Sequence, residues 1–572
     1  MRIEPYLAAK AADAIRDVHG VDAPPMLRPA KDAAHGDYQV DGLMALAKKL
    51  GRAPRDLAAP VAERLARVEG IARAEVAGPG FVNLTLDLGW LGARLGDALA
   101  DSARDGVPPA ERTQRVVVDF SAPNIAKEMH VGHLRSTILG DALCRLLRFL
   151  GHEVTGDNHL GDWGTQFGLL IVGTRRFGDP AALERDPLAE LERVYKLANA
   201  EAERDTTFAD EARAELAKLQ SGNIENRRHW ERFVAISREA LDRIYARLDV
   251  RFDVCLGESA YEHMLPGVIE LLLERGVARE DQGALCVFFE DEPGLGKSPF
   301  LVRKRDGAFL YATTDIATVL HRRDTFHADR ALYVVDQRQA LHFRQLFATV
   351  RKLGIEMALE HIAFGSILGA DGKPLKTRDG KVIKLGALLD EAEERAAERI
   401  RAEGIAQDAD SVAALARVVG IGAVKYADLS QNRLSDYRFE WDKLLSFKGN
   451  AGPYLQYAHA RIRAIFRKGE IDPERDLAGA IPVPAHPAEI VLAKALARFP
   501  DVVHQATDTS QPHLVCEHLY ALARDFSVFY EECPVLKAEG DARQSRLAFA
   551  WLVARQLARG LDLLGIHAPE RM

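Results

Sequence analysis

A run of β-branched residues, followed directly by a helical pattern and a second strand, most constrains the fold of this chain. Residues 115–121, RVVVDFS, are typical of a strand buried on both faces of a parallel sheet. Residues 130–152 then place apolar side chains at helical spacing, and residues 152–168 begin as a strand and break into a loop rich in glycine and aspartate. Strand, helix, strand and loop predict a βαβ unit, and therefore a doubly wound, Rossmann-type α/β domain that binds a nucleotide.

The rest of the chain is long enough for several domains, because 572 residues exceed what one hydrophobic core supports. Residues 1–108 mix helical patterns with the strand tract VAGPGFVNLTL and predict a small α/β domain. Residues 109–385 form the predicted Rossmann-type domain, with a charged helical insertion at about 175–245. Its later strand patterns are GALCVFF, FLVRKRDGAFLYATTDIA, RALYVVDQRQ and HIAFGSIL. Residues 386–446 are predicted to be a helical connection, and residues 447–572 an all-helical bundle.

Composition and charge exclude several classes of protein. No apolar run approaches the roughly 20 residues that a membrane span needs, and the N-terminus has the pattern of an amphipathic helix rather than a signal peptide. Five scattered cysteines without CxxC spacing predict a reducing cytoplasm and no structural metal site. The net charge of −8 is compatible with a nucleic-acid partner, because local arginine clusters matter more than the sum. No dimer seam is visible, so we expect a monomer.

His130, Gly132 and His133 stand where the first strand of the βαβ unit turns into its helix. Open parallel sheets bind ligands at this point, where the helix N-terminus attracts phosphate. Two imidazoles add donors, and the glycine allows backbone or ligand to approach closely. The arrangement suits an ATP triphosphate whose α-phosphorus is attacked while pyrophosphate leaves. Taken alone, so short a pattern is more often a pair of surface histidines at a helix start.

The surroundings of this turn resemble a known family. The stretch SAPNIAKEMHVGHLRSTILGDALCRLLRFLGHEV is similar to the "HIGH" signature region of class I aminoacyl-tRNA synthetases, and NHLGDWGTQFG resembles the bacterial arginyl-tRNA synthetases in particular. Further stretches resemble that family in order along the whole chain, namely HGDYQVDGLMALAKKLGRAPRDLA, YATTDIA, VVDQRQALHF, NAGPYLQYAHARI and LLGIHAPERM. The resemblance implies a Rossmann catalytic core, an N-terminal module that contacts the outer corner of tRNA, and a helical anticodon-binding domain. It also implies ATP, accompanied by Mg²⁺, L-arginine and the tRNA for arginine as ligands.

The activity implied by this resemblance is arginine–tRNA ligation in two steps. Arginine and ATP give arginyl-adenylate and diphosphate, and the 3'-terminal ribose of the tRNA then takes the arginine. Another HxGH nucleotidyltransferase is an alternative, which the helical C-terminal third disfavours. A catalytically inactive, synthetase-like RNA-binding protein is a second alternative, which the presence of His130, His133 and Lys127 disfavours.

The second signature of class I synthetases, KMSKS, is altered in this chain. By resemblance, the corresponding stretch of this chain is GADGKPLKTRDGKVIKL, residues 369–385. There Lys376-Thr-Arg-Asp-Gly replaces the lysine–serine pair of the signature. The charge of the leaving pyrophosphate must still be neutralised. Lys376 and Arg378 are therefore the candidates in this loop, and Lys127 is expected to supply a cation from the opposite side.

The amino-acid pocket needs carboxylates and oriented acceptors, because arginine presents a planar cation with five donors. Tyr311 and Asp315 are four residues apart and would share one face if their segment is helical. The resemblance implies that Asp119, Tyr311 and Asp315 face the guanidinium, and that Asn124 and Gln339 orient the head group of the amino acid. Taken singly, Asp119 would also serve as a turn cap and Asp315 as a surface acid.

Aromatic and cationic side chains alternate at the start of the predicted helical bundle. The candidates to stack on unpaired bases or to bind phosphates are Tyr454, Tyr457, His459, Arg461 and Arg463. Leu455 and Ile462 in the same stretch are expected to lie in the core.

Overall fold

The computed structural model describes residues 1–30, 32, 35–296, 298–369, 371–373, 375 and 383–572. The chain divides into two compact units. The central unit comprises Glu111–Ser446 and Leu563–Ile566, and the terminal unit comprises Met1–Ala110, Phe447–Asp562 and His567–Met572. Within the described ranges, none of the helices combines the length and the apolar character that crossing a membrane requires.

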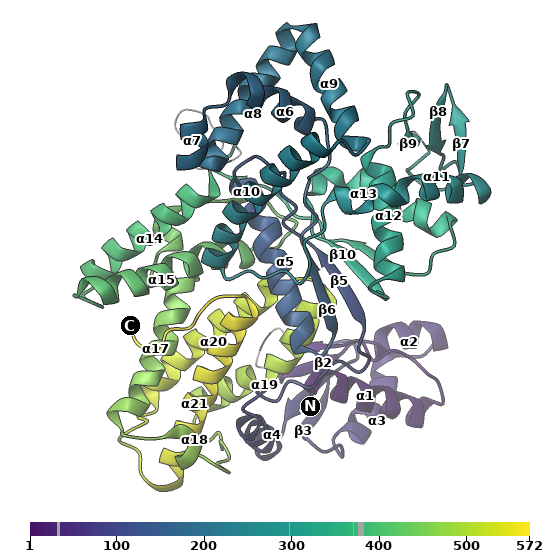
Figure 1. Ribbon diagram of the computed structural model, residues 1–572. Helices are drawn as coiled ribbons and strands as arrows, with labels where there is room; N and C mark the ends of the chain where they lie inside the picture. Colours follow the sequence, from purple (N-terminus) through teal and green to yellow (C-terminus); the bar gives the residue numbers. More distant parts are fainter. Residues whose placement is uncertain (31, 33–34, 297, 370, 374, 376–382) are drawn as a thin grey trace. The chain divides into compact units, whose positions relative to one another are not determined.

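A four-stranded parallel sheet lies at the core of the central unit (Figure 1). Its strands are β5 Arg115–Asp119, β6 Glu153–Asp157, β10 Arg330–Tyr333 and β11 Ala358–His361. They run in the order β11-β10-β5-β6, with Asp119 paired to Asp157 on one side and to Tyr333 on the other. The chain leaves β5 for β6 and later returns to β10 on the opposite side, so the carboxyl ends of β5 and β10 form the switch point at which open α/β sheets bind ligands.

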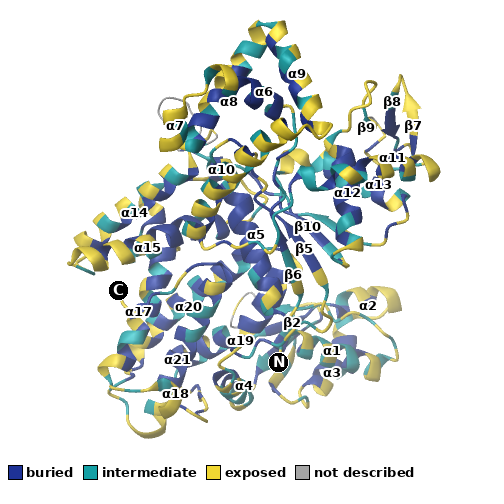
Figure 2. Cartoon of the chain, viewed as in Figure 1, coloured by how far each residue is buried: buried dark blue, intermediate teal, exposed yellow. Residues whose placement is uncertain are grey.

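Helix α5, Val131–Phe149, joins β5 to β6 and is buried along most of its length (Figure 2). Its apolar residues recur at helical spacing, as the sequence predicts, and pack towards the sheet. Gly140 permits a close approach, since a Cβ there would overlap the side chain of Phe120 at the end of β5. The amino end of α5 is thereby held at the switch point of the sheet.

The predicted helical insertion follows β6 and lies together at one end of the central unit (Figure 1). It consists of α6 Gln166–Phe177, α7 Pro180–Arg185, α8 Pro187–Arg204, α9 Thr206–Gln220 and α10 Ile224–Leu248. The last four helices each begin at an aspartate or asparagine whose side chain accepts from backbone N–H groups of the first turn. Phe208 and neighbouring apolar residues give this insertion a small core of its own.

A second insertion precedes β10 and surrounds a three-stranded antiparallel sheet. Its elements are η2 Glu258–Met264, α11 Leu265–Glu274, β7 Ala278–Asp281, β8 Ala284–Val287, β9 Phe300–Arg303 and α12 Tyr311–Asp324. After β10 come η3 Gln337–Gln339 and α13 Ala340–Lys352. The strand pattern expected through YATTDIA is wrong, because α12 begins at Tyr311. Ala312, Ile316 and Leu320 are buried at helical spacing, which an extended strand would not allow.

The central unit is completed by a short parallel pair of strands and three helices. These elements are β12 Ile367–Leu368, α14 Leu385–Ala402, α15 Ala409–Leu429, β13 Tyr437–Arg438 and α16 Trp441–Leu444. Arg135 of α5 and Asp428 of α15 form a buried ion pair at 3.1 Å, which ties these helices to the core of the unit.

The terminal unit combines an N-terminal α/β module with a C-terminal helical bundle (Figure 1). The module contains α1 Ile3–His19, β1 Leu27–Pro29, β2 Tyr38–Val40, α2 Leu43–Leu50, α3 Pro54–Leu65, β3 Ile71–Ala77, β4 Phe81–Leu86 and α4 Leu88–Ala100. The bundle contains α17 Gly452–Lys468, α18 Pro473–Asp476, α19 Pro487–Asp508, α20 His513–Glu532 and α21 Gly540–Leu563. Asp501 of the bundle accepts from the backbone N–H groups of Ile3 and Glu4, both at 3.1 Å, and thereby caps the first helix of the module.

Candidate active site

Two histidines cap the amino end of α5. His130 is the N-cap residue, and its Nδ1 accepts a hydrogen bond from the Gly132 backbone N–H at 3.0 Å. His133 accepts at Nδ1 from the His130 backbone N–H at 3.1 Å, and the two ring centroids lie 4.0 Å apart. The pair forms a capping box in which histidine takes both side-chain positions.

These hydrogen bonds fix the tautomer of both imidazoles. Each Nδ1 is an acceptor, so the ring proton resides on Nε2 and can be donated to a ligand. Burial lowers the pKa of His133 to about 4, and burial together with the Lys127 ammonium lowers the pKa of His130. Both rings are neutral near pH 7, and each offers one donor at the positive end of α5, where a polyphosphate binds well.

Glycine is required between these histidines because of the His130 ring. A Cβ at position 132 would lie 2.8 Å from His130 Cε1 and 2.9 Å from its Nδ1. Either the imidazole or the start of the helix would then have to move. The sequence predicts that another group approaches Gly132 closely, and in the structure that group is the His130 imidazole.

The loop between β5 and α5 has strained backbone. Ser121, Ala122 and Ala126 have φ angles of 72°, 46° and 60°, a region that residues with a Cβ rarely adopt. Ser136 Oγ accepts from the Ser121 N–H and Ser237 Oγ from the Ala126 N–H, each at 2.9 Å. Backbone strain that surrounding hydrogen bonds hold in place is typical of loops that bind ligands.

Lys127 supplies a cation beside the two histidines. Its Nζ lies 4.8 Å from the ring centroid of Tyr195, which belongs to α8 of the insertion. Lys384 forms an ion pair with Glu128 at 2.6 Å, so its charge is balanced within the chain. Lys376 and Arg378, the predicted cations of the second signature, lie outside the described residues.

Tyr311 and Asp315 lie on the first turns of α12, on one face of the helix as their spacing predicts. Tyr311 is 67% exposed, which is unusual for a tyrosine and leaves its ring available to a ligand. Asp315 Oδ2 lies 2.6 Å from His342 Nε2 on α13. The carboxylate of Asp315 is also close enough to Glu258 to raise the pKa of that residue.

Glu258 is an acid near Asp315 that the sequence analysis did not single out. It opens η2, and its carboxyl accepts from the backbone N–H of Trp163. Burial, followed by the charges of Asp162 and Asp315, raises the pKa of Glu258 to about 8. A half-buried acid among other acids is a candidate ligand for a cationic substrate. The segment GESAYE has no spacing pattern that marks a site, so only the tertiary structure identifies it.

Asp119 and Asp157, at the ends of β5 and β6, share a buried arginine. Arg322 Nη2 donates to Asp119 Oδ2 and to Asp157 Oδ2, both at 2.7 Å, and its side chain is fully buried. Asp119, predicted to bind the guanidinium of a substrate, therefore already binds one that belongs to the chain. Because a carboxylate has two acceptor oxygens, one oxygen of Asp119 is left for a second partner.

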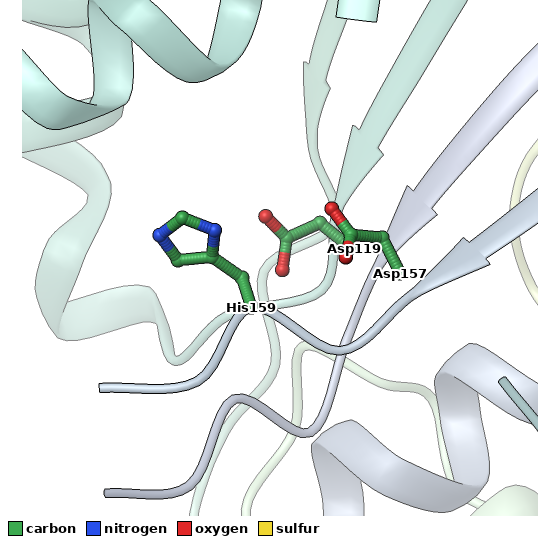
Figure 3. A group of neighbouring side chains, drawn as sticks. All are labelled: Asp119, Asp157 and His159. Carbon is green, nitrogen blue, oxygen red and sulfur yellow. The ribbon is translucent and has the colours of Figure 1, made fainter. Parts of the chain in front are cut away.

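His159 is turned towards the same two carboxylates (Figure 3). Ligand atoms of Asp119, Asp157 and His159 all lie within 4.8 Å of one another, a distance that a metal ion could bridge. The Arg322 guanidinium, however, binds both carboxylates and supplies their positive charge. The group fits a buried ion-pair network rather than a metal site.

The two residues predicted to orient the amino-acid head group follow neighbouring strands. Asn124 is exposed in the loop after β5, and its side chain packs on Gly161, where a Cβ would overlap the amide oxygen. Gln339 is exposed at the end of η3, which follows β10. Since β5 and β10 are adjacent and parallel, both residues lie at the edge of the sheet that carries Asp119.

Nearly the whole length of the chain matches domains of known synthetases. Residues 5–86 match the arginyl tRNA synthetase N-terminal domain, and residues 95–441 match the catalytic domain of class I (R) tRNA synthetases. Residues 455–572 match the DALR anticodon binding domain. The chain belongs to the class I arginyl-tRNA synthetase family.

Members of this family align with the chain from end to end. The arginine–tRNA ligase of Escherichia coli (strain K12) is 46% identical over 582 residues and covers 100% of both chains. That of Edwardsiella ictaluri is 48% identical over 562 residues, 96% of each chain. Structures of arginyl-tRNA synthetases from Plasmodium falciparum and Thermus thermophilus match all of this chain, with TM-scores of 0.85 and 0.84 at 28% and 27% identity; the match covers 99% and 100% of those chains. The predicted resemblance and the predicted fold class are confirmed.

In the C-terminal helical bundle, three of the five predicted RNA-binding side chains line one cavity. It has a volume of about 170 Å³ between α17 and α20, and Tyr454, Tyr457 and Arg461 contribute to its wall. Phe526 and Tyr530 line the opposite side, and the Arg461 guanidinium lies 5.5 Å from the Tyr530 ring centroid. Aromatic rings beside a cation suit an unpaired nucleobase and its phosphate.

His459 and Arg463, expected on the same RNA-binding surface, contact the C-terminal residues of the chain instead. His459 is buried, with Nδ1 3.0 Å from the Pro569 carbonyl oxygen, so the expectation for this residue is wrong. Arg463 forms an ion pair with Glu570 at 2.6 Å. Helical periodicity places both side chains on the face of α17 that the C-terminal segment covers.

Proposed function

We propose that this chain is an arginine–tRNA ligase that uses ATP to join L-arginine to the 3'-terminal ribose of its tRNA. In the first step the arginine carboxylate attacks the α-phosphorus of ATP and diphosphate leaves. In the second step a ribose hydroxyl of the tRNA takes the arginine and AMP leaves. The observation that carries the proposal is the pair of neutral imidazoles at the start of α5, the helix that follows the sheet strand ending in Asp119.

The triphosphate of ATP is assigned to the amino end of α5. His130 and His133 donate from Nε2 to phosphate oxygens, and the helix end adds backbone N–H groups and a positive potential. Gly132 keeps the His130 ring in place, and the Lys127 ammonium neutralises charge that develops on the leaving diphosphate. Because both rings stay neutral, they stabilise this charge without a proton transfer.

The guanidinium of arginine is assigned to a pocket with three sides. Asp315 and Glu258 supply carboxylates, and the exposed Tyr311 supplies a ring and a hydroxyl. Asp119 contributes the oxygen that Arg322 leaves free. Asn124 and Gln339, on the same edge of the sheet, bind the amino and carboxylate groups of the head. A planar guanidinium can satisfy several fixed acceptors at once, whereas the compact ammonium of lysine satisfies fewer.

Lys376 and Arg378 are assigned to the diphosphate from their place in the altered second signature. Mg²⁺ would be held by the phosphates of ATP. Asp119 and Asp157, which with His159 are spaced as metal ligands could be, are instead bound to Arg322. When bound, the ion would offset phosphate charge next to the imidazoles.

The tRNA is assigned to both parts of the terminal unit. Residues 447–572 would hold the anticodon, with Tyr454, Tyr457 and Arg461 binding one unpaired base in their cavity. Residues 1–108 would contact the outer corner of the tRNA. The central unit corresponds to a catalytic domain at 109–385 followed by a connection at 386–446. We further assign the protein to the cytoplasm, as a monomer.

ATP–pyrophosphate exchange with each amino acid, in the presence and absence of tRNA, tests this function. Exchange that depends on arginine supports the proposal. Exchange with another amino acid, or nucleotide transfer without any amino acid, would identify a different transferase. Tight tRNA binding without exchange under any condition would identify an inactive, RNA-binding relative.

A further inference from the structure

We propose that His342 is the positioning residue of the arginine pocket, and that its hydrogen bond to Asp315 determines the selection of a guanidinium over an ammonium. The inference rests on the proposed function, because it assumes that Asp315 binds the substrate side chain. His342 itself does not contact the substrate. It acts by fixing the plane of the carboxylate that does.

The contact between the two side chains is short and connects two helices. His342 Nε2 lies 2.6 Å from Asp315 Oδ2, and the residues belong to α13 and α12. A carboxylate oxygen accepts, so the proton resides on Nε2 and His342 is the donor. Within the described part of the chain, His342 is the only side chain that bonds Asp315. The other oxygen of Asp315 is left for a ligand.

The imidazole of His342 is itself held in one orientation. The Phe300 ring lies edge-on to it, with centroids 5.3 Å apart and planes at 63°. The Phe343 ring lies at 88° on another side, with centroids 5.5 Å apart. A donor packed in this way keeps the carboxylate in one rotamer, whereas a free aspartate would rotate about χ2.

The orientation of Asp315 matters because the carboxylate of the neighbouring Glu258 can repel it. Glu258 lies near Asp315, and the two negative charges repel when both carboxyls are ionised. The donor on His342 keeps Asp315 from turning away when Glu258 loses its proton. A guanidinium needs coplanar acceptors for paired hydrogen bonds, but an ammonium accepts nearly any direction. Loss of the donor should therefore weaken arginine binding more than lysine binding.

A matched pair of amides tests the proposal. In H342Q the side-chain amide can reach the place of Nε2 and still donate, whereas in H342N it is one carbon too short. We expect H342N to raise the KM for arginine about 10- to 100-fold and to lower the preference for arginine over lysine by a similar factor. H342Q should stay within about threefold of the wild type, and the KM for ATP should not change in either variant.

His361 provides the control for packing. Its ring also packs on Phe343, with centroids 4.6 Å apart, but its Nε2 contacts the Val335 carbonyl oxygen at 2.9 Å rather than a pocket carboxylate. We expect H361N to leave the KM for arginine unchanged, although it perturbs the same aromatic cluster. Tryptophan fluorescence and thermal unfolding verify that each variant is folded.

Three results would overturn the proposal. H342N could retain the wild-type KM for arginine, H342Q could lose as much as H342N, or H361N could raise the KM as much as H342N. If H342N does not fold, a comparison of H342Q with D315N still tests the proposal. H342Q retains the donor and should change the KM for arginine little, whereas D315N removes the charge of the acceptor and should raise it strongly. A wild-type protein that activates another amino acid would refute the proposed function instead, a result that the exchange assay identifies separately.

Discussion

The His133 imidazole accepts a hydrogen bond from the backbone N–H of His130 at 3.1 Å. This bond occupies Nδ1 and leaves the Nε2 proton for a ligand, so in the proposed function one ring both caps α5 and donates to the nucleotide. Substitutions at this position consequently change helix stability and catalysis together. The two effects can be separated with glutamate, which caps helices at this position but, when ionised, has no hydrogen-bond donor.

His133→Glu is expected to preserve the fold and slow arginyl-adenylate formation. Removal of one transition-state donor costs about 2.7–4 kcal/mol, or roughly 100- to 1,000-fold in rate, and the added negative charge beside the triphosphate should deepen the loss. His133→Ala should show the loss of the donor alone and, in addition, destabilise the protein by about 1 kcal/mol because the cap is lost. Rapid-quench measurement of the first turnover, together with urea unfolding, checks both. Wild-type rates in His133→Glu would show that Nε2 does not act on ATP.

Gly132→Ala should slow adenylate formation although alanine favours helices. Alanine is better than glycine in a helix by about 0.8–1.0 kcal/mol, but its Cβ would lie 2.8 Å from His130 Cε1 and displace the ring. Gly267→Ala in α11 is the matched control, since its surroundings are open. The first variant should lose activity and the second keep it. Equal activity in the two variants would contradict the role assigned to the His130 ring.

The affinity for arginine should increase with pH through the titration of Glu258. Burial and neighbouring carboxylates raise the pKa of this acid to about 8 in the arginine-free protein, so it is largely protonated below that pH. A guanidinium binds the ionised form better, and binding must therefore expel a proton. Calorimetry should show a dissociation constant that falls as pH rises from about 6 to 8 and then levels, with proton release in the lower range.

Glu258→Gln should abolish most of this pH dependence and raise the dissociation constant for arginine. The stability of the free protein should respond in the opposite sense. A carboxyl whose folded pKa is raised above its unfolded value destabilises the fold increasingly between pH 4.5 and about 8. The variant should thus be more stable than the wild type at pH 8.5, with little difference near pH 4. A pH-independent affinity in the wild type would exclude Glu258 from the pocket.

Arg322→Met should destabilise the central unit by about 3–5 kcal/mol, because it leaves Asp119 and Asp157 buried without their counter-ion. Arg323→Met is the control on the same helix, since Arg323 forms a surface pair with Asp324 and should matter by less than about 1 kcal/mol. Adding Asp157→Asn to Arg322→Met should restore part of the loss. Urea unfolding measures all three, and additive effects of the two changes would argue against a shared network.

Tyr457→Ala should weaken tRNA binding by about 5- to 150-fold, the range expected when one base loses its stacking partner. Arg461→Gln should reduce the slope of log affinity against log salt by about 1, as loss of a phosphate contact does. Lys468→Gln removes the same charge from α17 away from the cavity and should leave both quantities nearly unchanged. Filter binding over a salt series provides the measurement. An unchanged affinity in Tyr457→Ala would place the RNA elsewhere.

Local patterns in the sequence determined the βαβ unit and the turn to which the phosphate site is assigned. The β-branched run before Asp119 and the helical spacing after His130 follow from backbone geometry over a few residues, and they are correct in the structure. The same local rules misassigned the YATTDIA segment. Its threonines and isoleucine favour strands only weakly, and burial of Ile316 and Leu320 against the unit's core outweighs that preference.

Only the tertiary structure decided how the amino-acid pocket is built. Asp119 meets Arg322 across 203 positions of the chain, and Asp315 meets His342 because α12 and α13 pack together. Glu258 joins them from a segment without any recognisable spacing. The spacing of apolar residues along a strand or helix shows which side of that element is buried. It does not show which other element packs against that side. The sequence could therefore locate the turn before α5, which is local, while the proposed arginine pocket depends on contacts between distant segments that form only when the unit folds.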